Sequence, residues 1–257
     1  ILSYVCDSLL CQVKAAENGQ SLMQYFGCEK RTISGSAMIG IFDCLSTYET
    51  KLTNILKQGY ESVKLKIDPA SLSMVQRIIE LFNSQFKQIS VDANGSFRYD
   101  AAQKLLVGLP ESVIIEQPLN PREDDRLGDL LRILPNRVVL DESIRSLDDL
   151  ERLSNYNVGV MLKPVCCGGP SAFIEIVNRC AHLGIDCGIS GYLESGVGRL
   201  LHYILAQLPM LTLRPDFVWS NYYFSSDVLS VYEGCDVHYS SVDVNRVQVL
   251  NRLDIQS

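Results

Sequence analysis

In this 257-residue chain, polar residues end short apolar runs at a nearly constant spacing. The runs are rich in Val, Ile and Leu, and stretches with apolar residues at helical spacing separate them. From one run-ending polar residue to the next the step is 22 to 27 residues. These residues are Lys66, Asp92, Glu116, Asp141, Lys163 and Ser190. Because one strand–helix unit takes about 30 residues, the spacing predicts successive units whose strands all end at one rim.

The apolar runs predict eight strands. They cover residues 36–41, 62–67, 88–92, 112–116, 137–140, 159–163, 186–190 and 210–213. Helical patterns between them include residues 71–86, 124–134, 170–183 and 195–208. Strands that alternate with helices favour a parallel sheet, and right-handed crossovers close eight such units into an α/β barrel.

Composition excludes several classes of protein. Hydrophobic residues make up 47 % and charged residues 21 %, which is typical of a globular protein and not of a disordered one. The net charge of −7 and the lack of a Lys/Arg cluster argue against nucleic-acid binding. No apolar run reaches the roughly 18 residues of a membrane span. Nine scattered cysteines without a CxxC motif indicate free thiols, so we expect a cytoplasmic protein.

Asp92, Glu116 and Asp141 end three successive predicted strands, so we expect their carboxylates to lie close together. Three such groups repel one another unless a cation lies between them. Oxygen ligands without a nearby His or Cys favour Mg²⁺, with Mn²⁺ as the alternative. Asn94 follows the first carboxylate, where it either hydrogen-bonds that group or serves as a turn residue before Gly95.

Lysines flank the three carboxylates along the chain. Lys64 and Lys66 alternate on one predicted strand, so both point into the barrel, and Lys163 ends a later strand. Desolvation and neighbouring positive charge would lower the pKa of such lysines towards the range of a general base. The pattern suits removal of a proton next to a small-molecule carboxylate, with metal and lysine stabilising the resulting enediolate.

Five segments together carry a family resemblance. VKLKI, SVDANGSF, VIIEQPL, VVLDES and GVMLKP, in this order, resemble the enolase superfamily. Within it they resemble the branch with paired lysines, which includes muconate cycloisomerases, dipeptide epimerases, N-acylamino acid racemases and o-succinylbenzoate synthases. The resemblance covers roughly residues 35–235 and implies a (β/α)7β TIM barrel with an N-terminal α+β capping domain.

The resemblance also implies roles for single residues. By position, the Mg²⁺ ligands of the family match Asp92, Glu116 and Asp141. Lys66 matches the catalytic acid/base, and Lys64 matches the auxiliary lysine beside it. Lys163 matches the lysine on the opposite face.

The segment around Ser190 resembles that of the o-succinylbenzoate synthases, in which a serine and backbone amides hold the substrate. Ser190 and Gly191 would then contact substrate, or else form a helix N-cap and a Gly-rich turn, and Glu194 would bind substrate or cap the helix. A hydro-lyase of menaquinone or phylloquinone synthesis is thus expected.

Three alternatives stay open. The same lysines would serve an N-acylamino acid racemase or a dipeptide epimerase, although the last strand carries only Asp216 where such epimerases carry Asp-x-Asp. A barrel that binds metal without turnover is the third.

We expect residues 1–35 to be a remnant of the cap, 36–232 the barrel, and 233–257 a segment returning to the cap. The rest of the cap would be trimmed, naturally absent or supplied by a second chain, and the oligomeric state is open.

Overall fold

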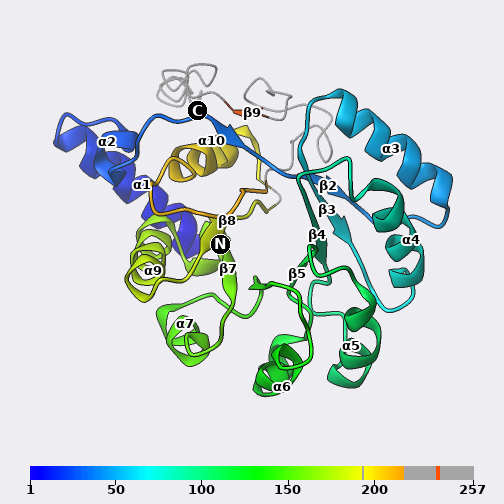
Figure 1. Cartoon of the computed structure of the whole chain (residues 1–257). Helices are drawn as coiled ribbons and strands as arrows, with labels where there is room; N and C mark the ends of the chain where they lie inside the picture. Colours follow the sequence, from blue (N-terminus) through cyan, green and yellow to red (C-terminus); the bar gives the residue numbers. More distant parts are fainter. Residues whose placement is uncertain (193, 217–235, 238–257) are drawn as a thin grey trace, which may run out of the picture.

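The computed structural model describes residues 1–192, 194–216 and 236–237. Its strands are β1 Ile33–Ser34, β2 Ala37–Ile39, β3 Ser62–Lys66, β4 Gln88–Asp92, β5 Ile114–Glu116, β6 Val138–Leu140, β7 Gly159–Leu162, β8 Cys187–Ile189 and β9 Asp236–Val237. Strands β2 to β8 form one parallel sheet in chain order. Figure 1 shows this sheet curled, with helices around its outside.

A helix follows each strand of the sheet. The helices are α1 Leu2–Glu17, α2 Leu22–Phe26, α3 Leu45–Lys57, α4 Leu72–Phe82, α5 Tyr99–Leu105, α6 Leu127–Leu131, α7 Leu147–Leu153, α8 Pro164–Cys167, α9 Pro170–Leu183 and α10 Gly196–Leu205. Two 3₁₀ turns, η1 Leu106–Gly108 and η2 Pro121–Arg126, lie in the connections. The helix expected over residues 124–134 is therefore split between η2 and α6. Seven strand–helix units confirm the expected (β/α)7β barrel class.

The last strand was wrongly placed by the apolar pattern. Residues 210–213 form no strand, because the amides of Thr212 and Leu213 both donate to the Cys187 carbonyl at distances of 2.9 and 3.0 Å. The chain instead reaches the sheet at Asp216, which forms parallel bridges with both Ser36 and Ser190. Since Ser36 precedes β2 and Ser190 follows β8, a single residue links the two ends of the curled sheet.

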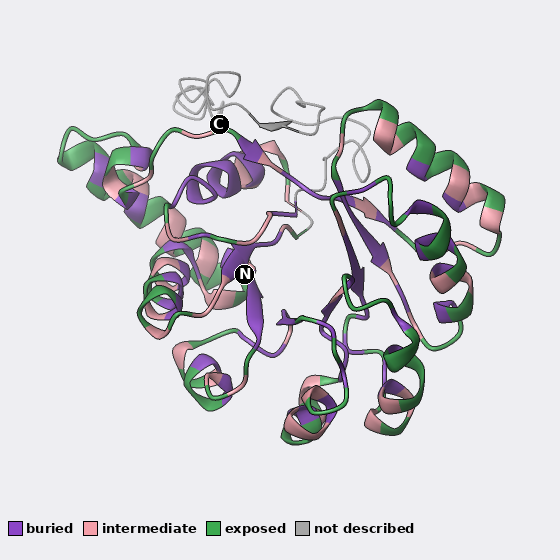
Figure 2. Cartoon of the chain, viewed as in Figure 1, coloured by how far each residue is buried: buried purple, intermediate pink, exposed green. Residues whose placement is uncertain are grey.

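Burial explains why these segments form strands and helices. The β6 and β7 residues are buried throughout, as expected for parallel strands covered on both faces. Helix α4 buries an apolar stripe and exposes its other side. Figure 2 shows the same division, with buried strands inside and exposed outer helix faces. The core thus lies between the sheet and the ring of helices, and leaves the carboxyl ends of the strands for function.

The N-terminal residues pack on the outside of the barrel. Helix α1 contacts α8 and α9, and α2 contacts α10. The Asp7 carboxylate accepts hydrogen bonds of 2.8 Å from the Ser171 amide and hydroxyl in the first turn of α9, an attachment between distant segments. That residues 1–35 are a remnant of a cap stays a prediction.

The C-terminal segment expected over residues 233–257 lies outside the described residues, except for β9. That strand pairs antiparallel with β1, Ile33 opposite Val237. Among the described residues, no helix has the length and hydropathy needed to cross a bilayer.

Candidate active site

Period-two alternation and strand register bring the expected residues together. Lys66 pairs with Asp92 across β3 and β4, and Asp92 pairs with Glu116 across β4 and β5. Asp141 comes directly after β6, and Lys163 directly after β7. All of these residues therefore lie at the carboxyl ends of parallel strands, the rim where barrels of this type carry their sites.

A cavity of about 620 Å³ opens at this rim. It is lined by Met38, Lys64, Lys66, Asp92, Asn94, Asp141, Glu142, Ile144, Arg145, Lys163, Cys166, Ser190, Gly191 and Tyr192. Eight of the expected site residues are in this lining. Glu116 and Glu194 are not. Glu116 is only 4 % exposed and lies behind Lys64, whose ammonium it contacts.

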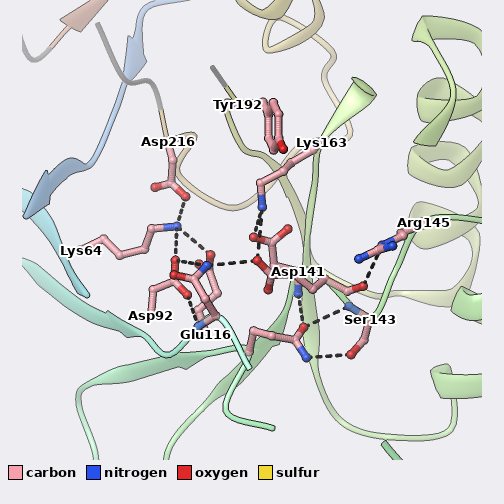
Figure 3. A network of polar contacts seen from close by, with 12 residues as sticks. Lys64, Asp92, Glu116, Asp141, Ser143, Arg145, Lys163, Tyr192 and Asp216 are labelled. Atoms are coloured by element: carbon pink, nitrogen blue, oxygen red, sulfur yellow. Dashed lines mark hydrogen bonds and ion pairs between the residues drawn. The ribbon is translucent and has the colours of Figure 1, made fainter. Parts of the chain in front are cut away.

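The lysines and carboxylates form two ion-paired clusters, and hydrogen bonds of Asn94 to Asp92, Lys66 and Glu142 join them into one polar network (Figure 3). Lys64 Nζ lies 2.7 Å from Glu116 Oε1 and 3.6 Å from Asp92 Oδ2, and it also donates to Asp216. Lys66 Nζ donates to Asp92 Oδ2 at 2.7 Å. Both lysines of β3 are therefore held by carboxylates that come from other parts of the sheet.

Lys163 stands on the far side of the cavity. Its ammonium donates to Asp141 and lies 3.9 Å from Glu142 Oε1. Counting the Asp216 segment as the eighth place of the ring, β3 and β7 are four places apart. Lys66 and Lys163 therefore come from opposite walls of the barrel.

Carboxylates, and not the other lysines, dominate the electrostatics of the buried cations. Burial by itself would lower the pKa of Lys64, but Asp216, Glu116 and Asp92 outweigh it and raise its pKa well above the ordinary value. Burial likewise opposes the charge on Lys163, while Asp141 raises its pKa above the usual range. The expectation that their pKa values fall was wrong for these two lysines, because each has a carboxylate closer than the next ammonium.

The carboxylates are affected unequally. Burial raises the pKa of Glu116 above its usual value, although Lys64 opposes the change, and burial raises that of Asp141 to about 6. Burial also opposes ionisation of Asp92, but Lys64 and Lys66 outweigh it and lower its pKa. Negative charge is thus held most firmly at Asp92, the carboxylate that contacts both lysines of β3.

The donor chemistry of this rim fits Mg²⁺. Asp92, Glu116 and Asp141 offer only carboxylate oxygens, the ligands that this ion prefers. Glu142 Oε2, beside the cavity, is buried without a hydrogen-bond partner in the described part of the chain. As they stand, no three acidic, Cys or His side chains there lie close enough together to hold one ion. The oxygen-rich rim is therefore suited to a cation.

Asn94 lies next to the first expected ligand. Its amide N–H donates to Asp92 Oδ1 at 2.9 Å, and its side-chain Oδ1 accepts from Lys66 Nζ at 2.5 Å. Its Nδ2 donates to Glu142 Oε1 at 3.0 Å. Asn94 also has a positive φ of 44°, so it holds the turn before Gly95 and orients Asp92 at the same time.

The residues expected to contact substrate divide into two groups. Ser190 and Gly191 line the cavity, but the Gly191 amide donates to the Asp216 carbonyl at 2.9 Å and is already engaged. Glu194 does not reach the cavity. Its carboxylate accepts from the Tyr192 amide at 2.9 Å and lies 3.4 Å from His202 Nε2. Glu194 thus bonds within the loop before α10, and that helix begins without a side-chain cap.

Among the residues of the site that sequence reasoning missed are Asp216, Gln117 and Arg145. Asp216 had been weighed only as part of an epimerase motif, and it is the buried partner of Lys64. Gln117, next to Glu116, bonds the loops after β4 and β6, and Arg145 lines the cavity. The available signal was position in the chain: Gln117 directly follows Glu116, and Arg145 lies in the loop that begins at Asp141.

Known proteins resemble this chain in sequence and in architecture. A family model described as enolase C-terminal domain-like matches residues 48–246. An o-succinylbenzoate synthase of Listeria innocua is 29 % identical over 218 residues, which cover 82 % of this chain and 57 % of the relative. An N-succinylamino acid racemase of an Amycolatopsis species is 30 % identical over 216 residues, 81 % of this chain and 58 % of the relative.

A solved structure has the same fold as this chain. The crystal structure of an enolase superfamily member from Listeria innocua superposes with a TM-score of 0.80 at 28 % identity, over 90 % of this chain and 63 % of that one. The chain thus spans less than two thirds of the length of these relatives. With the family model matching most of its length, the chain belongs to the enolase superfamily, among the enolase C-terminal domain-like proteins.

Proposed function

We propose that the chain carries the active site of an o-succinylbenzoate synthase, a Mg²⁺-dependent hydro-lyase of menaquinone or phylloquinone synthesis. The reaction is the syn-dehydration of 2-succinyl-6-hydroxy-2,4-cyclohexadiene-1-carboxylate to o-succinylbenzoate. The observation that carries the proposal is the placing of Lys66 and Lys163 on opposite walls of one carboxylate-rich cavity. The synthase among the relatives supports the choice of reaction.

In this proposal Asp92, Glu116 and Asp141 hold Mg²⁺. The bound ion would supply Lewis-acid stabilisation for negative charge that develops on the substrate carboxylate. Lys64 balances the charge of these ligands, because its ammonium contacts both Glu116 and Asp92. Asn94 orients Asp92 from the side.

Lys66 performs the proton transfers. Its side chain is 29 % exposed, against 2 % for Lys64, so it is the lysine of β3 that a substrate can reach. As the free amine it takes the proton from the carbon next to the carboxylate. The ammonium so formed gives that proton to the departing hydroxyl on the same face, which leaves as water. Lys163 faces the other side of the ring and stabilises the developing anion.

A spectrophotometric assay tests the proposal. The purified chain is mixed with the cyclohexadiene substrate in Mg²⁺ or in EDTA, and loss of the diene absorbance is followed. Consumption that requires Mg²⁺ and disappears in Lys66→Ala supports the synthase. An inactive wild-type chain that binds Mg²⁺ counts against it.

The second candidate is an N-succinylamino acid racemase, favoured by the Amycolatopsis relative. Lys66 and Lys163 would then exchange the α-proton from opposite faces. Exchange of that proton in D₂O, measured by NMR on N-succinyl-phenylalanine, distinguishes this activity. A dipeptide epimerase is less well supported, because Asp216 is buried against Lys64 and is not in the cavity lining.

We also propose a cytoplasmic location and a small carboxylate substrate. The eight described cysteines are all free of disulfides, which supports a reducing compartment.

A further inference from the structure

Four cationic side chains line the cavity, and they differ in what balances their charge. Lys64, Lys66 and Lys163 all contact carboxylates within the network. Arg145 forms no ion pair with any residue that the structure describes, although it lines the same cavity. Its charge is therefore available to an anion that enters from solvent.

The loop after β6 holds Arg145 at its base. The Arg145 amide donates to Asp149 Oδ2 at 3.1 Å, and its Nε donates to the Glu142 carbonyl at 3.2 Å. The two terminal nitrogens of the guanidinium have no partner among the described residues. A planar fork of this kind binds a carboxylate through two parallel hydrogen bonds.

The loop itself is well supported from below. Ser143 is buried, and its amide and hydroxyl both bond to the Gln117 side chain. Ile144 is buried as well, and its amide donates to the Asp141 carbonyl at 3.1 Å. Arg145 thus stands on a fixed turn, which reduces the conformational freedom lost when it binds a ligand.

We propose that Arg145 binds a second carboxylate of the substrate and so selects dianionic over monoanionic substrates. The inference rests on the proposed function, in which the ring carboxylate of the substrate goes to the rim of Asp92, Glu116 and Asp141. Figure 3 shows Arg145 on the Asp141 side of the network, away from Lys64. A carboxylate on a flexible arm, such as a succinyl group, would reach from the rim to Arg145.

The test compares two ligands that differ only in this second charge. Binding of o-succinylbenzoate and of its succinyl-arm methyl ester is measured by calorimetry in Mg²⁺. We expect wild type to bind the diacid about tenfold more tightly than the ester. Arg145→Met should reduce this ratio to about one while leaving ester affinity unchanged, and Arg145→Lys should restore part of it.

Arg77→Met is the matched control, because Arg77 is exposed on α4 and is not in the cavity lining. It should keep the wild-type ratio. A ratio that survives in Arg145→Met, or a wild type that binds neither ligand or both equally, overturns the inference. Calorimetry needs no turnover, so it tests Arg145 separately from the reaction. A wild-type chain that consumes no diene, but binds the diacid more tightly than the ester and loses this preference in Arg145→Met, would refute the synthase and leave the role of Arg145 standing.

Discussion

Exposure separates the roles of residues that share one charge network. Lys64 is almost completely buried among carboxylates, whereas Lys66 keeps 29 % of its side chain exposed at the cavity. Asp141, on the opposite side, is buried and held by Lys163. A general base must reach its substrate and a metal ligand must face the ion, so these residues should respond differently to substitution.

Lys66→Ala should therefore lose turnover, and Asp141→Ala should lose Mg²⁺ affinity. We expect Lys66→Ala to lower turnover by about 10³-fold while Mg²⁺ affinity is kept, since a base is lost and no ligand. Asp141→Ala should weaken Mg²⁺ binding by at least about tenfold. Calorimetric titration with Mg²⁺, alongside the diene assay, measures both.

Each of these variants is the control for the other. Substantial residual turnover in Lys66→Ala would remove its assigned role. Unchanged Mg²⁺ affinity in Asp141→Ala would remove that residue from the ligand set.

Cys44 should be a reactive thiol at neutral pH. Hydrogen bonds from Ser46 and Thr47, at the start of α3, lower the pKa of Cys44 to about 7. The thiolate is the nucleophile, so alkylation by iodoacetamide should be half-maximal near pH 7 and rise over roughly pH 6 to 8. Cys166, whose pKa is raised mainly by burial, should react more slowly at pH 7. Peptide mass mapping against pH measures both.

Substitution of the hydrogen-bonding neighbours provides the control for Cys44. Ser46→Ala should move its alkylation profile to higher pH, because it removes a hydrogen bond that stabilises the Cys44 thiolate and lowers its pKa. A Cys44 profile centred above pH 8 in wild type would contradict the prediction.

Between elements, one glutamine connects the ends of three strands. Gln117 is fully buried directly after β5, with a positive φ of 39°. Its Oε1 accepts from the amides of Asp141 and Ser143, and its Nε2 donates to the Ser143 hydroxyl and the Leu119 carbonyl. Its own carbonyl accepts from Gly95 after β4. The side chain of Gln117 thus connects the segments after β5 and β6, and its main chain connects them to the loop after β4.

Gln117→Met should destabilise the fold by about 2 to 4 kcal/mol, because buried polar groups lose their partners at similar side-chain volume. Gln117→Glu should cost at least as much, since an ionised carboxylate would be buried without a cation and would face the Leu119 carbonyl in place of a donor. Urea unfolding measures the difference.

Gln103→Met on α5 provides the comparison, because the Gln103 side chain makes no hydrogen bond with the other described residues. It should change the free energy of unfolding by less than about 0.5 kcal/mol. Equal effects at positions 103 and 117 would mean that the Gln117 hydrogen bonds contribute nothing.

Across the whole molecule, the same ion pairs that arrange the site also close the barrel. Asp216 bridges the first and last strands of the sheet, and Lys64 joins it to Glu116 and Asp92. The ammonium is 2 % exposed, so its removal leaves buried carboxylates without a cation.

Lys64→Met should lower the free energy of unfolding by about 3 to 5 kcal/mol at pH 7. Adding Asp216→Asn should recover part of this loss, because one unpaired charge is removed. Lys87→Met is the matched control. Its ion pair with Glu61 is exposed, so its removal should cost less than about 1 kcal/mol. Urea unfolding that finds the two single variants equal would contradict a role of Lys64 in closing the barrel.

Local pattern accounts for most of what could be predicted. Strand alternation points Lys64 and Lys66 to one side, and a constant spacing places Asp92, Glu116 and Asp141 at successive strand ends, whatever the rest of the fold does. The eighth strand was misplaced because an apolar run does not reveal its hydrogen-bond partners. Within residues 210–213, the amides of Thr212 and Leu213 both donate to the Cys187 carbonyl, which is not a strand pattern.

The sequence by itself determined the barrel class and the ring of ionisable residues, since both follow from periods of two and of about 25 residues along the chain. Only the tertiary structure decided what those residues contact. It paired Lys64 with Asp216, 152 positions away, and turned Glu194 out of the cavity. It also left Arg145 without a carboxylate partner among the described residues. Charge balance and pKa depend on distances between atoms, and the distances between residues remote in sequence are set when the barrel closes.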